Sequence, residues 1–358
     1  MSKTPRWPLA VPPAAAALLV AAFALPMGTV LGTLSVLALL GAVMAAVHHA
    51  EVIAHRVGEP FGTLVLALAV TIIEVALIVS MMVAGGADQA ALARDTIFST
   101  VMIVANGVIG LCLLAGSLHH REQAFRIPGA HTSLATLIAM CTLTLVLPTF
   151  TTTTPGPTYA LSQLAFAAAM SLVLWLAFVF VQTVRHRDYF LPETGAADPE
   201  RHAEPPSHRA TALSAGLLAV SLVAVVGLAK ALSPTIEAGL DAMGAPPAVL
   251  GIAIALLVLL PETVASIRAA AADRLQTSLN LAYGSALASI GLTIPAVAAA
   301  SVLMDIPLVL GLGAKDLVLL LLTMFVSILT LGSGRTHLMP GVLHLVIFAA
   351  FLFLALVP

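Results

Sequence analysis

Long apolar runs separated by short polar breaks are the feature that most constrains what this chain can fold into. A helix needs about 20 apolar residues to cross the hydrocarbon core of a bilayer. Runs of that length predict eleven spans, at residues 8–26, 29–48, 61–83, 96–118, 132–149, 160–183, 211–231, 247–267, 276–302, 306–331 and 338–357. Because only helices or closed barrels satisfy their backbone in lipid, runs of this length predict an all-α membrane protein.

The composition supports the same class. The 358 residues are 60% hydrophobic and 9% charged, with a mean hydropathy of +1.07, whereas soluble domains carry about 25% charged residues. We therefore expect membrane lipid to cover most of the surface. The net charge of −2 gives no basic bias toward nucleic acid. Cys112 and Cys141 lie inside apolar runs, which argues against a disulfide framework.

The distribution of Lys and Arg predicts the orientation in the membrane. With the N-terminus inside, 12 of the 15 Lys and Arg residues fall in inside segments and 3 fall outside. The positive-inside rule then predicts a cytoplasmic N-terminus and a C-terminus on the opposite side of a cell inner membrane. The three outside residues are Arg94, Lys230 and Lys315.

A polar stretch at residues 184–210, rich in charge and proline, predicts a cytoplasmic linker. The linker divides the chain into an extra helix (1–28), a first five-helix repeat (29–183) and a second five-helix repeat (211–358). Five is odd, so the two repeats have opposite orientations in the membrane. Inverted repeats of this kind are typical of secondary transporters.

Two glutamates interrupt the apolar runs at corresponding places, in the second helix of each repeat. Glu74 lies about thirteen residues into its run and Glu262 about fifteen into its own; at a rise of about 1.5 Å per residue, both fall near the middle of the bilayer. Ionisable residues at that depth are costly and usually functional. A protonated glutamate that only bonds a neighbouring helix is the structural alternative.

Carboxylate oxygens suit hard cations such as Ca²⁺ or Na⁺, and protons compete for the same oxygens. Two negative charges balance one Ca²⁺ fully, and monovalent ions remain candidates. Backbone carbonyls are expected where helices unwind, at Gly107, Gly284 and Pro261. Packing or bonding to the residue's own helix is the alternative for each small polar side chain. The further candidate ligands are Thr71, Thr263, Asn106, Gly284 and Ser285.

A second polar cluster precedes the third predicted span. His48, Glu51 and His55 recur at helical spacing, and Glu59 follows them. Histidine titrates near physiological pH, so a proton-relay role is one interpretation of the cluster, and a solvated cytoplasmic loop is the other. The spacing differs from HExxH, which disfavours a metalloprotease.

Three features resemble the cation/Ca²⁺ exchanger superfamily, in its cation/proton branch, and specifically bacterial sodium/potassium/calcium–proton antiporters. The stretches are HHAEVIAHRVGEPFGTLVLALAVTIIEVALIVS (48–80) and PETVASIRAAAADRLQTSLNLAYGSALASIGLTIPA (261–296), joined by the layout of one plus five plus five helices. The resemblance implies cation binding by Glu74 and Glu262. Thr71 stands where these exchangers have Asn, and Leu259 stands at the equivalent place in the second repeat, which argues against a strict high-affinity calcium site.

The sequence therefore predicts a cation/proton antiporter with no cofactor, in which Ca²⁺, or also Na⁺ or K⁺, is exchanged for H⁺ at the two glutamates. The alternatives are a channel or membrane scaffold, and an intramembrane metal-dependent enzyme built on His48, Glu51 and His55. The sequence leaves the oligomeric state open.

Overall fold

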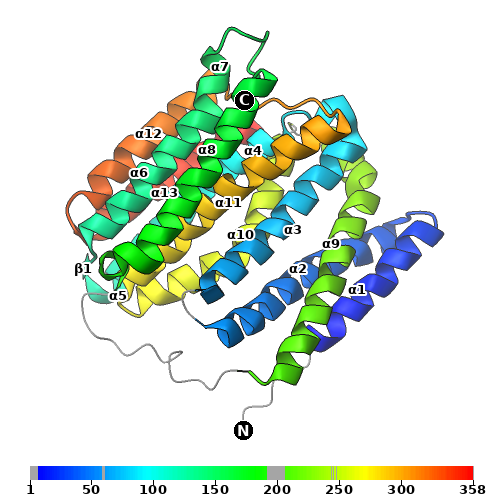
Figure 1. Cartoon of the computed structure of the whole chain (residues 1–358), viewed down its shortest axis with the longest axis horizontal. Coiled ribbons are helices and arrows are strands. Elements are labelled where there is room, and N and C mark those ends of the chain that lie inside the picture. The colour runs from blue at the N-terminus through cyan, green and yellow to red at the C-terminus, as the bar shows by residue number, and fades with distance from the viewer. Residues whose placement is uncertain are drawn as a thin grey trace. The chain divides into compact units, whose positions relative to one another are not determined.

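The structure is a computed structural model that describes residues 7–58, 61–191, 206–242, 244, 246 and 248–357. Within these residues, 11 helices are long and apolar enough to cross a membrane (Figure 1). The predicted number of spans and the all-α membrane class are thereby confirmed. Most of the predicted linker lies outside the described residues.

Helix α2 (Thr29–Val57) runs well past its predicted end at residue 48. The segment VHHAEVIAHRV contains no glycine or proline, so nothing in it stops the helix. Gly58 does: its φ of 75° suits glycine, and its N–H bonds the carbonyl of Ala54 at 2.9 Å. His48, Glu51 and His55 are therefore helical residues, and the interpretation of this region as a loop is wrong.

The chain forms two compact units, and the first comprises Met1–Gln89 and Asp198–Ala245. Its helices are α1 (Trp7–Ala24), α2, α3 (Phe61–Gly85) and α9 (His208–Ala242), followed after α3 by the short η1 (Gly86–Gln89). Helix α9 packs along α1, α2 and α3. Buried His49 ties three of these helices together, because its ring nitrogens lie 2.9 Å from the Pro8 carbonyl oxygen and 3.2 Å from Ser214 Oγ.

The second unit comprises Ala90–Ala197 and Pro246–Pro358. Each unit takes helices from both predicted repeats, so the units are a different division of the chain and the repeat boundaries stay a prediction. The elements of the second unit are α4 (Leu92–Met102), η2 (Ile103–Val108), α5 (Ile109–His120), β1 (Gln123–Ala124), α6 (Ile127–Cys141), η3 (Thr142–Val146), α7 (Leu147–Phe150), α8 (Leu161–Phe180), η4 (Val181–Arg185), η5 (Arg187–Phe190), α10 (Ala248–Ala271), α11 (Leu275–Met304), α12 (Ala314–Leu331), β2 (Arg335–Thr336) and α13 (Leu338–Leu356).

Helix α12 shows how the second unit suits lipid. Its large apolar side chains, including Leu321 and Phe325, are exposed, while the hydroxyl-bearing Thr323, Ser327 and Thr330 are buried. This is the reverse of a soluble amphipathic helix. It fits a helix whose outer face meets lipid tails and whose inner face provides polar contacts between helices.

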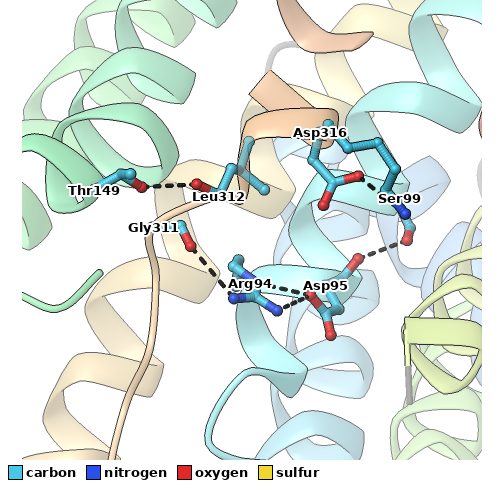
Figure 2. A network of polar contacts seen from close by, with 8 residues as sticks. Arg94, Asp95, Ser99, Thr149, Gly311, Leu312 and Asp316 are labelled. Atoms are coloured by element: carbon cyan, nitrogen blue, oxygen red, sulfur yellow. Dashed lines mark hydrogen bonds and ion pairs between the residues drawn. The ribbon is translucent and has the colours of Figure 1, made fainter. Parts of the chain in front are cut away.

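Two groups of polar contacts, which we call clamps, join segments from the two predicted repeats within the second unit. In the first clamp, β1 pairs with β2 in antiparallel register, with Gln123 opposite Thr336, and Gln123 Nε2 also donates to the Ala270 carbonyl and to Asp273 Oδ1, each at 2.9 Å. In the second clamp, the Arg94 guanidinium pairs with Asp95 at 2.8 Å and donates to the Gly311 carbonyl at 3.3 Å (Figure 2). The first clamp holds together the connections that precede α6 and α13. The second clamp holds the first turn of α4 to the segment that precedes α12.

Candidate functional site

Glu74 lies in the interior of α3, where its side chain is 3% exposed. Thr71, one helical turn earlier, is 5% exposed, and the buried neighbours Ile73, Leu77 and Ile78 are apolar. A carboxylate in such surroundings loses hydration and must be compensated by a proton, a cation or hydrogen-bond donors. Glu74 and Thr71 thus lie one helical turn apart on α3, and both residues are buried.

Glu262 lies in α10, between Pro261 and Thr263, and all three residues are half-buried. Thr263 Oγ1 donates to the Leu259 carbonyl of its own helix at 2.7 Å, which is the back-bonding alternative named above. A hydroxyl that donates in this way still has an oxygen able to accept. The cation role of Thr263 therefore stays a prediction, and Glu262 belongs to the second unit whereas Glu74 belongs to the first.

The predicted unwinding at Pro261 and Gly284 is wrong. Helix α10 continues through Pro261, and α11 continues through Gly284 and Ser285. Proline and glycine are tolerated inside membrane helices, because the surrounding helix keeps most of its bonds in an apolar medium. Proline still has no N–H, so the carbonyl four residues earlier, that of Leu257, lacks its usual helical donor. One freed oxygen is therefore available without a helix break.

Gly284 and Ser285 are half-buried on α11. A Cβ added at Gly284 would meet no other atom within 4 Å. The backbone here thus borders open space, a property that suits the approach of a ligand to the helix surface.

At Gly107 the structure has a change of helical register where the sequence predicts unwinding. Residues Ile103–Val108 form a π-helical segment, η2, between α4 and α5, and every residue of it is buried. Single π turns inside α-helices carry an extra residue and often mark functional positions. Asn106 lies in this segment with its side chain fully buried.

Both ends of the Asn106 amide have partners within the second unit. Asn106 Nδ2 donates to Thr323 Oγ1 at 2.9 Å, and Asn106 Oδ1 lies 3.1 Å from His344 Nδ1. On its other side, His344 Nε2 lies 3.1 Å from Thr330 Oγ1. We call these four side chains the Asn106 network; none is more than 6% exposed.

Close packing of α13 brings His344 to Asn106. A Cβ on Gly341 would lie 2.8 Å from the Leu114 nitrogen, and one on Gly107 would lie 3.2 Å from the Phe348 ring. A Cβ on Gly110 would come within 2.9 Å of the Leu345 side chain. Glycine at these three positions lets the helices approach closely, as small residues do between membrane helices.

The sequence interpretation missed His344, Thr323 and Thr330. One signal was available: His344 is the one titratable side chain in residues 338–357, and intramembrane ionisable residues are functional candidates by default. Nothing in the local sequence pairs this histidine with Asn106, because the two residues are 238 positions apart.

Comparison with known proteins decides the family. Residues 27–184 and 213–357 match the family described as sodium/calcium exchanger protein. The chain belongs to this family. The exchanger is 50% identical over 321 residues to y4hA of Sinorhizobium fredii (strain NBRC 101917 / NGR234), an alignment that covers 89% of this chain and 87% of y4hA. It is 33% identical over 330 residues to the sodium-potassium/proton antiporter ChaA of Escherichia coli (strain K12), with 92% and 89% of the two chains covered.

Solved structures share the exchanger's fold. The structure of native YfkE matches with a TM-score of 0.73 at 17% identity, covering 98% of this chain and all of YfkE. The crystal structure of the H⁺/Ca²⁺ exchanger CAX matches with a TM-score of 0.70 at 15% identity, covering 97% of this chain and 87% of CAX. Together with the family match, these similarities establish an integral membrane cation exchanger or antiporter, and they rule against the enzyme alternative.

The histidine cluster of the exchanger lies on the last turns of α2. His48 is half-buried, whereas Glu51 and His55 are exposed, and Glu59 lies outside the described residues. Positions 48, 51 and 55 share one side of the helix. No group of three or more His, Cys, Asp or Glu side chains suited to a metal ion occurs among the described residues.

Proposed function

We propose that this exchanger moves a cation against protons and that Glu74 and Glu262 are the groups for which the two compete. The observation that carries the proposal is that Glu74 is 3% exposed inside an apolar helix, and Glu262 lies in α10 at the place predicted to match it. A buried carboxylate must be neutralised. A proton and a metal cation are alternative ways to do so, and only one can occupy a given oxygen.

Exchange follows from this competition together with alternating access. On one side of the membrane the cation displaces protons from the carboxylates, and on the other side protons displace the cation. Further oxygens are proposed from Thr71, Thr263, Asn106, Ser285 and the backbone near Gly284. The carbonyl of Leu257, freed by Pro261, is an additional oxygen on the helix that carries Glu262.

We propose Ca²⁺ as the principal cation, because two carboxylates balance its charge and oxygen is its preferred ligand. Na⁺ and K⁺ are further candidates, which the similarity to a sodium-potassium/proton antiporter supports. Thr71 and Leu259 in place of amides in the two repeats also favour a broader range of cations.

The proposed setting is a cell inner membrane, with the N-terminus cytoplasmic and the C-terminus on the opposite side. The sorting of 12 Lys and Arg residues against 3 supports this orientation. Under an inward proton-motive force, the direction expected is export of the cation. Reporter fusions at the two ends of the chain test the orientation: activity of a cytoplasmic reporter at both ends would contradict it.

Proteoliposome flux tests the transport proposal. An imposed pH gradient should drive Ca²⁺, Na⁺ or K⁺, measured in parallel with the opposing proton flux. Glu74→Gln and Glu262→Gln should each abolish exchange, because an amide neither ionises nor releases a proton. Asp188→Asn, the same carboxylate-to-amide change at an exposed position, serves as the control and should transport normally.

Two results would overturn the proposal. Normal exchange in both glutamine variants would remove the assigned site. Voltage-driven cation current without proton movement in the unmodified protein would replace exchange by a channel.

A further inference from the structure

His344 is a buried imidazole with a partner on each ring nitrogen. It lies on α13, its side chain is fully buried, and it contacts Asn106 on one side and Thr330 on the other. The helices packed against α13 are α5, α10 and α12, together with η2. A histidine in such a place is either a proton-carrying group or a group that fixes its neighbours.

The hydrogen-bond pattern favours the second role. Asn106 Nδ2 donates to Thr323, which turns Asn106 Oδ1 toward His344. An amide oxygen only accepts, so His344 Nδ1 carries the hydrogen, and in the neutral ring Nε2 then accepts from the Thr330 hydroxyl. Both partners are neutral groups, and a neutral imidazole can donate to Asn106 and accept from Thr330 at the same time.

This arrangement fixes the direction of the Asn106 amide. Its oxygen uses one lone pair for His344 Nδ1 and keeps a second lone pair, while the bond to Thr323 prevents the amide from flipping. Groups of this kind, one step behind a metal ligand, commonly set the ligand's orientation.

We propose that His344 is a positioning residue for cation binding: bonded to Thr330 on one side, it orients the Asn106 amide in η2 so that the amide oxygen serves the transported cation. The inference rests on the proposed function, and specifically on Asn106 as one of the cation's oxygen ligands. It adds a residue on the last helix, far in sequence from both glutamates, that acts on the cation only through Asn106.

Thr330 gives a separate way to reach the network. It lines a cavity of about 340 Å³ together with Glu122, Arg335 and His337. Substitution of Thr330 therefore changes the partner of His344 Nε2 without changing the imidazole or its bond to Asn106. The competing role for His344 is that of a proton carrier. It would use the same cavity, because titratable groups at its wall could pass protons through Thr330 to Nε2.

The experiment compares His344→Gln, His344→Leu and Thr330→Val in binding and flux. Cation affinity is measured by calorimetry on purified protein with Ca²⁺, and the Michaelis constant and maximal rate of exchange are measured in proteoliposomes across pH. Thr144→Val is the matched control. Thr144 is also fully buried in a π-helical segment of the second unit, but its hydroxyl bonds only the Met140 carbonyl of its own helix.

The leucine variant should weaken Ca²⁺ affinity and raise the Michaelis constant by about 10- to 100-fold, as loss of an outer-shell partner does, with a smaller change in maximal rate. Glutamine can donate to Asn106 and accept from Thr330, so His344→Gln should restore most of the affinity and keep the unmodified pH profile. Thr330→Val should give an intermediate loss, because the imidazole loses one of its two restraints. Thr144→Val should leave the affinity unchanged.

Three outcomes would overturn the inference. Equal loss in the glutamine and leucine variants would show that hydrogen bonding at Asn106 is not what matters. Loss of pH-driven exchange in His344→Gln with Ca²⁺ affinity intact would make His344 a proton carrier instead. Unchanged affinity in both His344→Leu and Thr330→Val, while Glu74→Gln and Glu262→Gln abolish exchange, would remove the positioning role and leave the proposed function standing. If His344→Leu does not fold, the affinity of Thr330→Val still tests the positioning role, and the pH dependence of His344→Gln still tests the role of proton carrier.

Discussion

Two helix pairs are predicted as repeat equivalents, α3 with α4–η2–α5 and α10 with α11, and they differ in burial, in helix continuity and in the space beside the helix. In the first pair, Glu74 is a buried residue, the second helix contains a π-helical segment, and both ends of the Asn106 amide are bonded. In the second pair, Glu262 is half-buried, α11 is continuous, and Gly284 borders open space. We infer that the first pair supplies fixed ligands and the second supplies room for an ion to enter.

The largest effect expected from this difference concerns the length of the two carboxylate side chains. Glu74→Asp should reduce exchange by about 100-fold, at the upper end of what misplaced metal-site groups cost, because its packed surroundings cannot follow the shortened side chain. Glu262→Asp should cost less, about 10-fold, because Glu262 as a whole residue is more exposed than Glu74. Ca²⁺-dependent proton flux in proteoliposomes measures both losses.

Equal losses in the two aspartate variants would show that the difference in burial has no bearing on cation binding. A larger loss at Glu262 than at Glu74 would instead assign the fixed ligands to the second helix pair and the room for the ion to the first.

A matched pair of glycine substitutions sharpens the comparison. Gly341→Ala places a methyl group against the Leu114 nitrogen and the Gly110 carbonyl, at 2.8 and 3.1 Å, so overpacking should lower the free energy of unfolding by about 1–3 kcal/mol. Gly284→Ala meets no atom within 4 Å and should instead raise it by about 0.5–1 kcal/mol, the usual gain for alanine over glycine inside a helix. Thermal unfolding in detergent measures both changes.

The rate of exchange provides a second test of the Gly284→Ala variant. Gly284→Ala should exchange more slowly despite its higher stability, because the added methyl group occupies the space through which the ion is proposed to approach. A stable Gly284→Ala protein with the unmodified rate would exclude that space from the ion's path.

The sequence alone was sufficient to predict the membrane-spanning helices and to pick out the residues that are unusual within a span. Runs of apolar residues predict all eleven spans, because span length follows from bilayer thickness alone. At Gly107 the residues ANG at 105–107 predicted unwinding, and the structure instead contains a π-helical segment within a continuing helix. The same reasoning failed at Pro261 and Gly284, because an isolated proline or glycine removes or loosens only one bond of a helix whose remaining bonds hold in an apolar medium.

Contacts between distant segments were beyond what the sequence could predict. The Asn106 network joins η2, α12 and α13, and its hydrogen-bonded pairs are 14 to 238 positions apart. Its formation depends on the close approach that Gly107, Gly110 and Gly341 permit. Glycine is frequent in membrane helices generally, so a glycine in an apolar run does not by itself mark a contact or name its partner helix. The division into two compact units also depends on packing, and it follows neither predicted repeat.

A smaller effect is expected at Pro261, which distinguishes α10 from α3. Pro261→Ala restores an N–H that can bond the Leu257 carbonyl, so the free energy of unfolding should rise by about 1 kcal/mol, the net value of one hydrogen bond. Exchange should slow modestly if that carbonyl serves the cation, and Ca²⁺ affinity should fall with it. Higher stability with unchanged affinity would leave the Leu257 carbonyl out of the site.

The smallest effect is expected at the end of α2, where the first repeat carries a histidine cluster that the second does not. We propose that His48, Glu51, His55 and Glu59 pass protons toward Glu74. Because Glu51 and His55 are exposed, water can replace much of their contribution. Replacing His48 and His55 together by glutamine should slow exchange slightly when proton supply limits the rate, and should leave Ca²⁺ affinity unchanged.

Proton flux is measured at low buffer concentration, where proton supply limits the rate, and at high buffer concentration, where buffer delivers protons in place of the side chains. A deficit that added buffer does not relieve would argue against a relay, and a loss of Ca²⁺ affinity would place these histidines at the cation site instead.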